Sequence, residues 1–459
     1  MNLFANIDNI YFAGIGGIGM SALARYFLAG GYNIAGYDRL RSELTEKLSA
    51  EGCIITYQER INEIPPAFRS SNTIVIFTPA IPSTNIILNH FIEEGYHVYK
   101  RAAILGIISE HSRTIAIAGT HGKTTITTLA AHLIKQSTVD CTAFLGGISK
   151  NYNSNLILGQ GEFTVMEADE YDRSFHTLTP ELALITSMDP DHLEVYGNHE
   201  KMIEAYNTFA ARIRKGGKLV VNSNIRHLIR DIEGVTIFTY GSDEGSDFSI
   251  GHSAIKNEAY HFEVKSPFGT LEKLVWTIPG KPNLQNAVAG ISLALFAGVD
   301  INEIRKSLLM FKGVERRFDV RLDTGKIIFI DDYAHHPEEL NFLIDSVIQF
   351  YGGKKISAAF QPHLFSRTRD HAPAFARSLD RLHRVFLLPV YPAREEPVEG
   401  VTSSLIFDNM TVAERALVTR EELLEELKNI ETDIFITIGA GDIDRLVEPV
   451  RKLLEERNK

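Results

Sequence analysis

The sequence of 459 residues contains only two cysteines, no long apolar run and no excess of positive charge. Cys53 and Cys141 lie far apart and lack the spacing of a metal site, which favours a reducing cytoplasm. No uninterrupted apolar stretch approaches the length of a membrane span, and no basic region of the kind that opens a signal peptide begins the chain. We therefore expect a cytoplasmic protein without membrane insertion.

Acidic residues outnumber basic ones, 58 against 47, which gives a formal net charge of −11. A nucleic-acid-binding surface needs a basic stripe, so this balance argues against nucleic acid as a partner. The hydrophobic content of 44% and the charged content of 23% are ordinary for a globular protein. A chain of this length exceeds a single hydrophobic core, so about three domains are expected.

A predicted strand leads into a glycine turn and a lysine at Thr114-Ile-Ala-Ile-Ala-Gly119-Thr120-His121-Gly122-Lys123-Thr124-Thr125, and an apolar helical pattern follows. The glycines let backbone N–H groups approach phosphate oxygens, and the helix N-terminus adds partial positive charge. Lys123 would reach the outer phosphates, and the hydroxyl of Thr124 or Thr125 would ligate Mg²⁺. Ile117 stands where the strict motif has glycine, so the loop is a shorter variant. We interpret it as an ATP site, the alternative being a glycine turn without a ligand.

Another glycine turn, the first in chain order, follows a predicted strand near the start of the chain. Gly14, Gly16 and Gly19 fit G-x-G-x-x-G, and Asp38 ends the next predicted strand at the spacing that binds a ribose hydroxyl. With further strands predicted at 54–57, 73–78 and 97–99, this part is expected to be a doubly wound sheet. The turn indicates a diphosphate ligand, which NAD, FAD and UDP-sugars share. An NAD-linked dehydrogenase and a turn without a ligand are therefore alternatives.

Carboxylates follow two predicted strands in the middle of the chain. The strand Phe163–Glu167 runs into Asp169, Glu170 and Asp172, which suits Mg²⁺ bound to phosphates. The strand 182–187 leads to His192 amid acids, and this histidine could ligate a second metal or transfer protons. Residues 247 to 277 alternate with a period of two, which predicts an antiparallel extension. A helix is expected from about Asn283, its proposed N-cap, to Phe296.

The last third again alternates predicted strands and helices, and its polar residues gather after two strands. His335 and His336, in Asp331-Asp-Tyr-Ala-His-His-Pro337, could be metal ligands or could cap a helix. Arg367 and Arg369 could bind a carboxylate through two hydrogen bonds, as an incoming amino acid requires. The alternative for either arginine is a surface ion pair.

In combination, these segments resemble the Mur ligases, ATP-dependent amino-acid ligases of peptidoglycan synthesis, along almost the whole chain. The matching segments are Gly14–Ser21, Gly119–Thr125, Glu167–Glu170, Asp191–Gly197, Asn283–Ala287, Gly313–Phe318, Asp331–Pro337 and Gln361–Asp370. The resemblance implies an α/β fold of three domains. These are an N-terminal Rossmann-like domain that binds a UDP-sugar (1–107), a central P-loop-type ATPase domain with a mixed sheet (108–315), and a C-terminal Rossmann-like domain that binds an amino acid (316–459).

The resemblance also implies which residues form each site. The UDP-sugar residues are Gly14, Gly16, Gly17, Ile18, Gly19, Met20 and Asp38. The ATP residues are Gly119, Thr120, His121, Gly122, Lys123, Thr124, Thr125 and Asn286, and the Mg²⁺ residues are Thr124, Thr125, Glu167 and His192. The amino-acid residues are Tyr333, His363 and Arg367, and the residues expected to act in catalysis are Lys123, His192, His336 and Arg367.

The activity implied is ATP-dependent ligation of L-alanine to the lactyl carboxylate of UDP-N-acetylmuramate through an acyl phosphate, by a monomer or weak homodimer. Later ligases of the family carry a carbamylated lysine where this sequence has residues 204–209, which contain no lysine. That difference favours the first-step branch or the related ligase that recycles a murein tripeptide. The family often has histidine at Pro282 and arginine at Leu364. A non-catalytic nucleotide-binding module is a weaker alternative, because the lysine, carboxylates and histidine all follow predicted strands.

Overall fold

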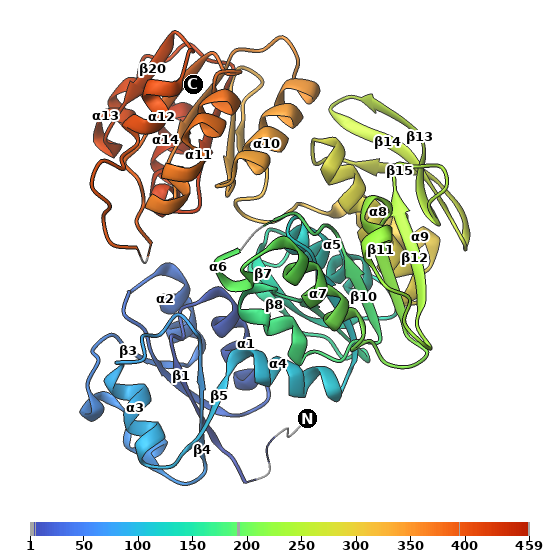
Figure 1. Ribbon diagram of the computed structural model, residues 1–459, viewed down its shortest axis with the longest axis vertical. Helices are drawn as coiled ribbons and strands as arrows, with labels where there is room; N and C mark the ends of the chain where they lie inside the picture. The colour runs from blue at the N-terminus through green and yellow to red at the C-terminus, as the bar shows by residue number, and fades with distance from the viewer. Residues whose placement is uncertain (1–3, 5, 191–192, 394, 458–459) are drawn as a thin grey trace. The chain divides into compact units, whose positions relative to one another are not determined.

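The computed structural model describes residues 4, 6–190, 193–393 and 395–457 (Figure 1). The chain divides into two compact units. The first comprises Met1–Ser253, Phe262–Val275 and Gln285–Lys312, and the second comprises Ala254–His261, Trp276–Leu284 and Gly313–Lys459. Among the described residues, no helix has both the length and the apolar character needed to cross a bilayer.

The chain begins with a five-stranded parallel sheet in the order β3-β2-β1-β4-β5. Its strands are β1 (Asn9–Ala13), β2 (Asn33–Tyr37), β3 (Ile54–Thr56), β4 (Thr73–Phe77) and β5 (His97–Lys100). The helices between and after them are α1 (Ile18–Ala29), α2 (Glu43–Glu51), α3 (Ile86–Glu93) and α4 (Arg101–Glu110). Every residue of β1 is buried, as expected for the central strand of a parallel sheet covered on both faces. The predicted doubly wound sheet is confirmed.

A ten-stranded sheet follows, in the order β15-β14-β13-β12-β11-β10-β6-β9-β7-β8. The strands are β6 (Arg113–Ala118), β7 (Cys141–Ser149), β8 (Ser154–Ile157), β9 (Phe163–Glu167), β10 (Leu182–Ile185), β11 (Lys218–Asn222), β12 (Thr236–Gly241), β13 (Phe248–Lys256), β14 (Ala259–Ser266) and β15 (Gly269–Trp276). The helices are α5 (Lys123–Lys135), α6 (Leu193–Tyr196), α7 (His199–Ala210), α8 (Lys281–Phe296) and α9 (Ile301–Met310). Strand β6 lies between β9 and β10, parallel to both, so the carboxyl ends of these three strands meet at one edge.

The predicted antiparallel extension corresponds to β13, β14 and β15. Two-residue links join these neighbouring strands, and Asn257 and Glu258 in the first link both have positive φ, which is the backbone of a tight hairpin turn. The prediction that Asn283 caps α8 is wrong. The helix begins at Lys281, and the Asn283 amide donates back to the carbonyl of Pro279 at 2.7 Å, inside the first turn.

The C-terminal sheet has six strands in the order β16-β17-β21-β18-β19-β20, all parallel except β16. The strands are β16 (Asp319–Asp323), β17 (Ile328–Asp332), β18 (Ile356–Phe360), β19 (Arg384–Leu387), β20 (Glu414–Leu417) and β21 (Ile434–Ile438). The helices are α10 (Pro337–Phe350), α11 (Phe365–Leu379), α12 (Ser404–Asn409), α13 (Arg420–Leu427) and α14 (Val447–Arg457). This mixed sheet confirms the second Rossmann-like α/β fold.

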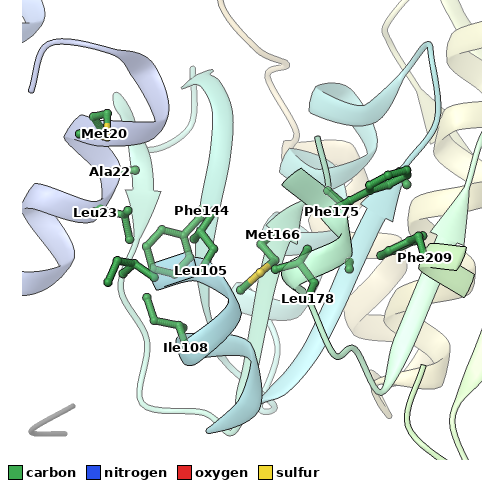
Figure 2. Packing of buried hydrophobic residues seen from close by; sticks show 14 of the residues in the cluster. Met20, Ala22, Leu23, Leu105, Ile108, Phe144, Met166, Phe175, Leu178 and Phe209 are labelled. Carbon is green, nitrogen blue, oxygen red and sulfur yellow. The ribbon is translucent and has the colours of Figure 1, made fainter. Parts of the chain in front are cut away.

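One hydrophobic core runs through the first two sheets. Leu23 of α1 and Leu105 and Ile108 of α4 belong to the same buried cluster as Phe144 of β7 and Met166 of β9 (Figure 2). The cluster extends to Phe209 of α7. Burial of this continuous apolar surface explains why the first sheet and most of the second belong to one compact unit. The domain boundaries expected at 107/108 and 315/316 stay predictions.

Candidate active site

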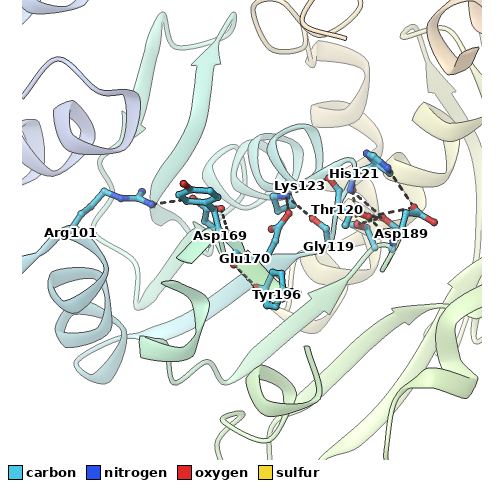
Figure 3. A network of polar contacts seen from close by, with 12 residues as sticks. Arg101, Gly119, Thr120, His121, Lys123, Asp169, Glu170, Asp189 and Tyr196 are labelled. Carbon is cyan, nitrogen blue, oxygen red and sulfur yellow. Dashed lines mark hydrogen bonds and ion pairs between the residues drawn. The ribbon is translucent and has the colours of Figure 1, made fainter. Parts of the chain in front are cut away.

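The glycine-lysine loop leaves the carboxyl end of β6 and enters α5 (Figure 3). Gly119 has φ +127°, and a Cβ built on it would lie 1.9 Å from Oγ1 of Thr186 and 2.8 Å from the Thr186 nitrogen. Gly122 has φ +79°, and its Cβ would lie 2.8 Å from Oδ1 of Asn286. Both positions therefore require glycine, for conformation and for space. The second contact brings the predicted adenine-side residue Asn286 against the loop.

Lys123 turns back into its own loop and meets a buried carboxylate. Its Nζ donates to Oε1 of Glu170 and to the Gly119 carbonyl, both at 2.7 Å. Only 14% of the Lys123 side chain and 2% of the Glu170 side chain remain accessible. Burial alone would lower the pKa of Lys123, but the carboxylates of Glu170, Glu167 and Asp169 together raise it above its ordinary value. The lysine is therefore a fixed cation at the centre of the loop.

Residues after β10 hold the other side of the loop. The Ser187 hydroxyl lies 2.7 Å from the Thr120 hydroxyl and accepts the His121 N–H at 3.1 Å, and the Asp189 N–H donates to the Thr120 hydroxyl at 3.2 Å. No role was predicted for Ser187 or Asp189. Small polar residues after a strand that neighbours β6 were the available signal, but the strand order is visible only in the fold.

The predicted magnesium residues lie at the same edge of the sheet. Glu167 ends β9, and a Cβ built on Gly146 would lie 2.1 Å from its Oε2, so the backbone of β7 closely confines this carboxylate. Thr124 and Thr125 are buried in the first turn of α5. The second oxygen of buried Glu170 has no hydrogen-bond partner among the described residues. Carboxylate and hydroxyl oxygens are the donors that Mg²⁺ prefers, so this set fits the ion. His192 and Asp191 lie outside the described residues.

The first glycine turn connects β1 to α1. Gly14 has φ +85° and donates to the carbonyl of Tyr37 at 2.8 Å. The carboxylate of Asp38 accepts the N–H groups of Gly16 at 2.8 Å and of Leu40 at 3.1 Å, so it holds the turn in place. Its contact with a ribose stays a prediction.

Of the other residues predicted for this turn, Gly17 is the N-cap of α1 and Ile18 is partly exposed at the start of the helix. Gly19 follows Ile18 in the first turn. Met20 is buried in the hydrophobic core, so only its backbone can face a ligand.

The histidine pair before Pro337 lies at the start of α10. The ring of His336 accepts the Glu338 N–H at 3.5 Å as the N-cap of the helix, which confirms the capping interpretation for this residue. His335 lies 3.3 Å from the carboxylate of Glu339, and burial lowers its pKa despite that carboxylate. The ring of Tyr333 packs under the guanidinium groups of Arg316 and Arg317, at 5.0 and 4.8 Å.

The two arginines of α11 differ in what they contact. Arg369 is exposed and pairs with its neighbour Asp370 at 2.7 Å, so the surface ion-pair interpretation holds for it. Arg367, in the first turn of the helix, forms no hydrogen bond or ion pair with any described residue. The ring of His363 stacks on Tyr391 in the preceding loop. Leu364, which follows His363, has φ +67°, a backbone conformation that a leucine adopts only under strain.

Two adjacent carboxyls end β17 in the same unit. Burial raises the pKa of Asp331 to about 7, although Arg316 and the Thr437 hydroxyl oppose the shift. Burial likewise raises the pKa of Asp332 to about 6, although its oxygens accept the N–H groups of Phe318 and Ala334. Desolvation of a buried charge is the dominant cause in both cases.

Family comparisons match nearly all of the chain. The Mur ligase family catalytic-domain model matches residues 9–113, the Mur ligase middle-domain model matches 117–294, and the Mur ligase glutamate-ligase-domain model matches 316–441. The chain belongs to the Mur ligase family. Its ATP-dependent ligase class accounts for a glycine-lysine loop beside carboxylates.

Individual relatives of this Mur ligase cover the chain almost completely. UDP-N-acetylmuramate–L-alanine ligase of Parabacteroides distasonis is 47% identical over 98% of this chain and 97% of its own length. The protein of the same name from Cytophaga hutchinsonii is 42% identical over 100% of this chain and 99% of its own length.

Solved structures show the same three-domain α/β fold. The UDP-N-acetylmuramate–alanine ligase of Thermotoga maritima superposes with a TM-score of 0.81 at 26% identity, over 98% of this chain and 99% of that one. A murein peptide ligase from Psychrobacter arcticus superposes with a TM-score of 0.70 over 98% of this chain and 99% of that one. At 20% identity, this second likeness concerns the fold alone.

Proposed function

We propose that this Mur ligase joins L-alanine to the lactyl carboxylate of UDP-N-acetylmuramate, with ATP converted to ADP and phosphate, in peptidoglycan precursor synthesis in the cytoplasm. The observation that carries the proposal is identity of 42–47% over nearly the whole chain to relatives that bear this activity in their names. The site geometry supports it, because the fold provides a phosphate loop with a fixed lysine, a glycine turn between β1 and α1, and an arginine, Arg367, that pairs with no described residue.

The proposed chemistry proceeds in two steps. The lactyl carboxylate attacks the γ-phosphate of ATP, which gives an acyl phosphate and ADP. The amine of L-alanine then attacks the acyl carbon, and phosphate leaves as the amide forms. The loop from Gly119 to Thr125 and Asn286 bind the nucleotide, and the ammonium of Lys123 lies against the transferring phosphoryl group. Glu167, the hydroxyls of Thr124 and Thr125, and His192 would hold Mg²⁺, which neutralises phosphate charge when bound.

The C-terminal unit receives the amino acid in this proposal. The guanidinium of Arg367 binds the L-alanine carboxylate, and it is available to do so because no described residue pairs with it. His363 and Tyr333 complete the pocket, and His336 accepts the proton that the amine releases. Much of the rate then comes from the positioning of three substrates.

Phosphate release tests the proposal. Purified protein is mixed with ATP, Mg²⁺ and UDP-N-acetylmuramate, and phosphate is measured with L-alanine, with other amino acids or with the murein tripeptide. Release that depends on L-alanine and on UDP-N-acetylmuramate is expected. Preference for the tripeptide would favour the recycling ligase instead, and no release with any acceptor would refute the ligase assignment.

A further inference from the structure

The first turn of α1 has two backbone donors that the described structure leaves open. The N–H of Gly16 donates to Asp38 and that of Met20 to the Gly17 carbonyl, but those of Ile18 and Gly19 have no acceptor among the described residues. The turn has neither an acidic residue nor a side-chain cap. Open donors at a helix N-terminus favour an anion, but they are common and define no site by themselves.

An arginine lies directly against this turn. A Cβ built on Gly19 would stand 2.3 Å from Nη1 and 3.1 Å from Cζ of Arg101. The guanidinium therefore occupies the space that the missing side chain of Gly19 leaves. A cation from the start of α4 thus stands beside an open donor from the start of α1.

The position of Arg101 is unfavourable for its own helix. Arg101 is the first residue of α4, Lys100 is the N-cap, and the first turn contains no acidic residue. Positive side chains at a helix N-terminus are repelled by the helix dipole. Helix stability therefore gives no reason for a cation here, whereas an anionic ligand would.

The only described ion-pair partner of Arg101 is Asp169, and the contact is loose (Figure 3). One nitrogen lies 3.4 Å from Oδ2, longer than a normal charge-assisted hydrogen bond. Arg25, by comparison, forms a two-pronged pair with Glu51 at 2.7 and 2.8 Å. Most N–H groups of the Arg101 guanidinium therefore have no acceptor among the residues that the structure describes.

We propose that Arg101 is a substrate-binding residue that contacts the diphosphate of the UDP-sugar, together with the N–H groups of Ile18 and Gly19. Asp169 competes with the diphosphate for the same guanidinium. This role rests on the proposed function, which supplies the diphosphate. The alternative is that the Arg101–Asp169 pair has only a structural role and links α4 to the segment after β9.

The two roles predict opposite effects of neutralising Asp169. Binding of UDP-N-acetylmuramate is measured by titration calorimetry without ATP or L-alanine. Arg101→Ala should weaken binding about 10- to 100-fold, the effect of losing charged hydrogen bonds to phosphate. Asp169→Asn should tighten binding, because the competing anion is lost. If the Arg101–Asp169 pair has only a structural role, both variants break the same contact and should change the affinity for UDP-N-acetylmuramate in the same direction.

Arg113→Ala is the matched control for the arginine substitution. Arg113 is the first residue of β6, at the opposite end of that strand from the phosphate loop, and it pairs with Glu181 at 2.7 Å. Its loss should leave the affinity for UDP-N-acetylmuramate unchanged. Arg101→Lys, which keeps the charge but not the forked donor geometry, should give an intermediate affinity.

A comparison of three ligands tests whether Arg101 contacts the diphosphate. Arg101→Ala should weaken the binding of UDP as much as the binding of UDP-N-acetylmuramate. The affinity for uridine, measured by competition, should stay unchanged. An equal loss with uridine would refute a diphosphate contact. If the wild-type protein binds neither UDP nor UDP-N-acetylmuramate, the proposed function is refuted. If the wild-type protein binds tightly and Arg101→Ala binds equally tightly, only the role of Arg101 is refuted. Circular dichroism verifies that each variant is folded.

Discussion

Removing the charge of Lys123 tests whether the phosphate loop is built around a buried ion pair. In Lys123→Met, Glu170 loses its partner while its side chain remains 2% exposed. A buried charge without a partner is avoided by taking up a proton, and protonating a glutamate of ordinary pKa costs about 3.7 kcal/mol at pH 7. Breaking a buried pair typically costs about 3–5 kcal/mol, so we expect a loss of about 3–4 kcal/mol at pH 7.

The same reasoning predicts how this loss depends on pH. At pH 5 protonating an ordinary glutamate costs only about 1 kcal/mol, so the destabilisation should shrink by about 2.7 kcal/mol between pH 7 and pH 5. In Lys123→Met/Glu170→Gln no carboxyl remains at this position, and the pH dependence should disappear.

Hydrogen exchange of the α5 amides is the suitable assay, because it reports the opening of this element without assuming that the whole chain unfolds in one step. The exchange rates are corrected for the intrinsic effect of pH. A loss of equal size at both pH values would refute the explanation through Glu170, and no loss at pH 7 would show that the pair contributes nothing.

Three further predictions concern other parts of the site. Arg367→Ala should lower kcat/KM for L-alanine about 10- to 100-fold, mainly through KM, whereas Arg369→Ala, an exposed and already paired neighbour, should change it little; equal effects would contradict the assignment. Burial raises the pKa of Asp331 to about 7 and that of Asp332 to about 6, so folding stability should fall as pH rises from about 4 to about 7; Asp331→Asn should show a smaller fall, the part that Asp332 contributes, in urea denaturation followed by tryptophan fluorescence. Gly146→Ala should push the carboxylate of Glu167 aside and raise KM for magnesium-ATP about tenfold or more, without loss of circular-dichroism signal; an unchanged KM would remove Glu167 from the site.

The position of the single tryptophan makes unfolding of the unit that contains Asp331 measurable. The single tryptophan, Trp276, belongs to the same compact unit as Asp331, so its fluorescence reports on the unit in question. The sign follows from proton binding. Between about pH 4 and 7 the folded protein keeps a proton on Asp331 that the unfolded chain has released, so a rise in pH favours unfolding.

The sequence predicted the parallel sheets well because their signal is local. Short, largely apolar runs such as β1 and β21 are expected to be strands at the centre of a covered sheet, and the glycine turns after β1 and β6 mark where the chain turns into a helix. Strand ends differ by a residue or two, since the final pairing depends on the neighbouring strand. Asn283 failed as a cap because Lys281 and Pro282 already adopt helical conformation, and a proline at N2 is compatible with a first turn.

Contacts between distant residues could not be predicted in the same way. The sequence shows that Lys123 is a cation and that Glu170 is one of several anions, but only the order β6-β9 shows that these two meet. Ser187 was missed for the same reason, because its role depends on β10 lying on the other side of β6. Arg367 and Arg369 are indistinguishable in sequence, and their difference lies entirely in what surrounds each side chain.

The segment after β9 links these observations. Asp169 and Glu170 are adjacent in the chain, yet one pairs with Arg101 beside the first glycine turn and the other with Lys123 in the phosphate loop (Figure 3). Anions at these two positions keep both cations in place, and each is a weaker partner than a diphosphate because it carries one charge rather than several. In the proposed function, a substrate phosphate displaces either carboxylate without a rearrangement of the sheet. Replacing the carboxylate by a phosphate then costs more free energy at the buried Lys123–Glu170 pair than at the loose Arg101–Asp169 pair.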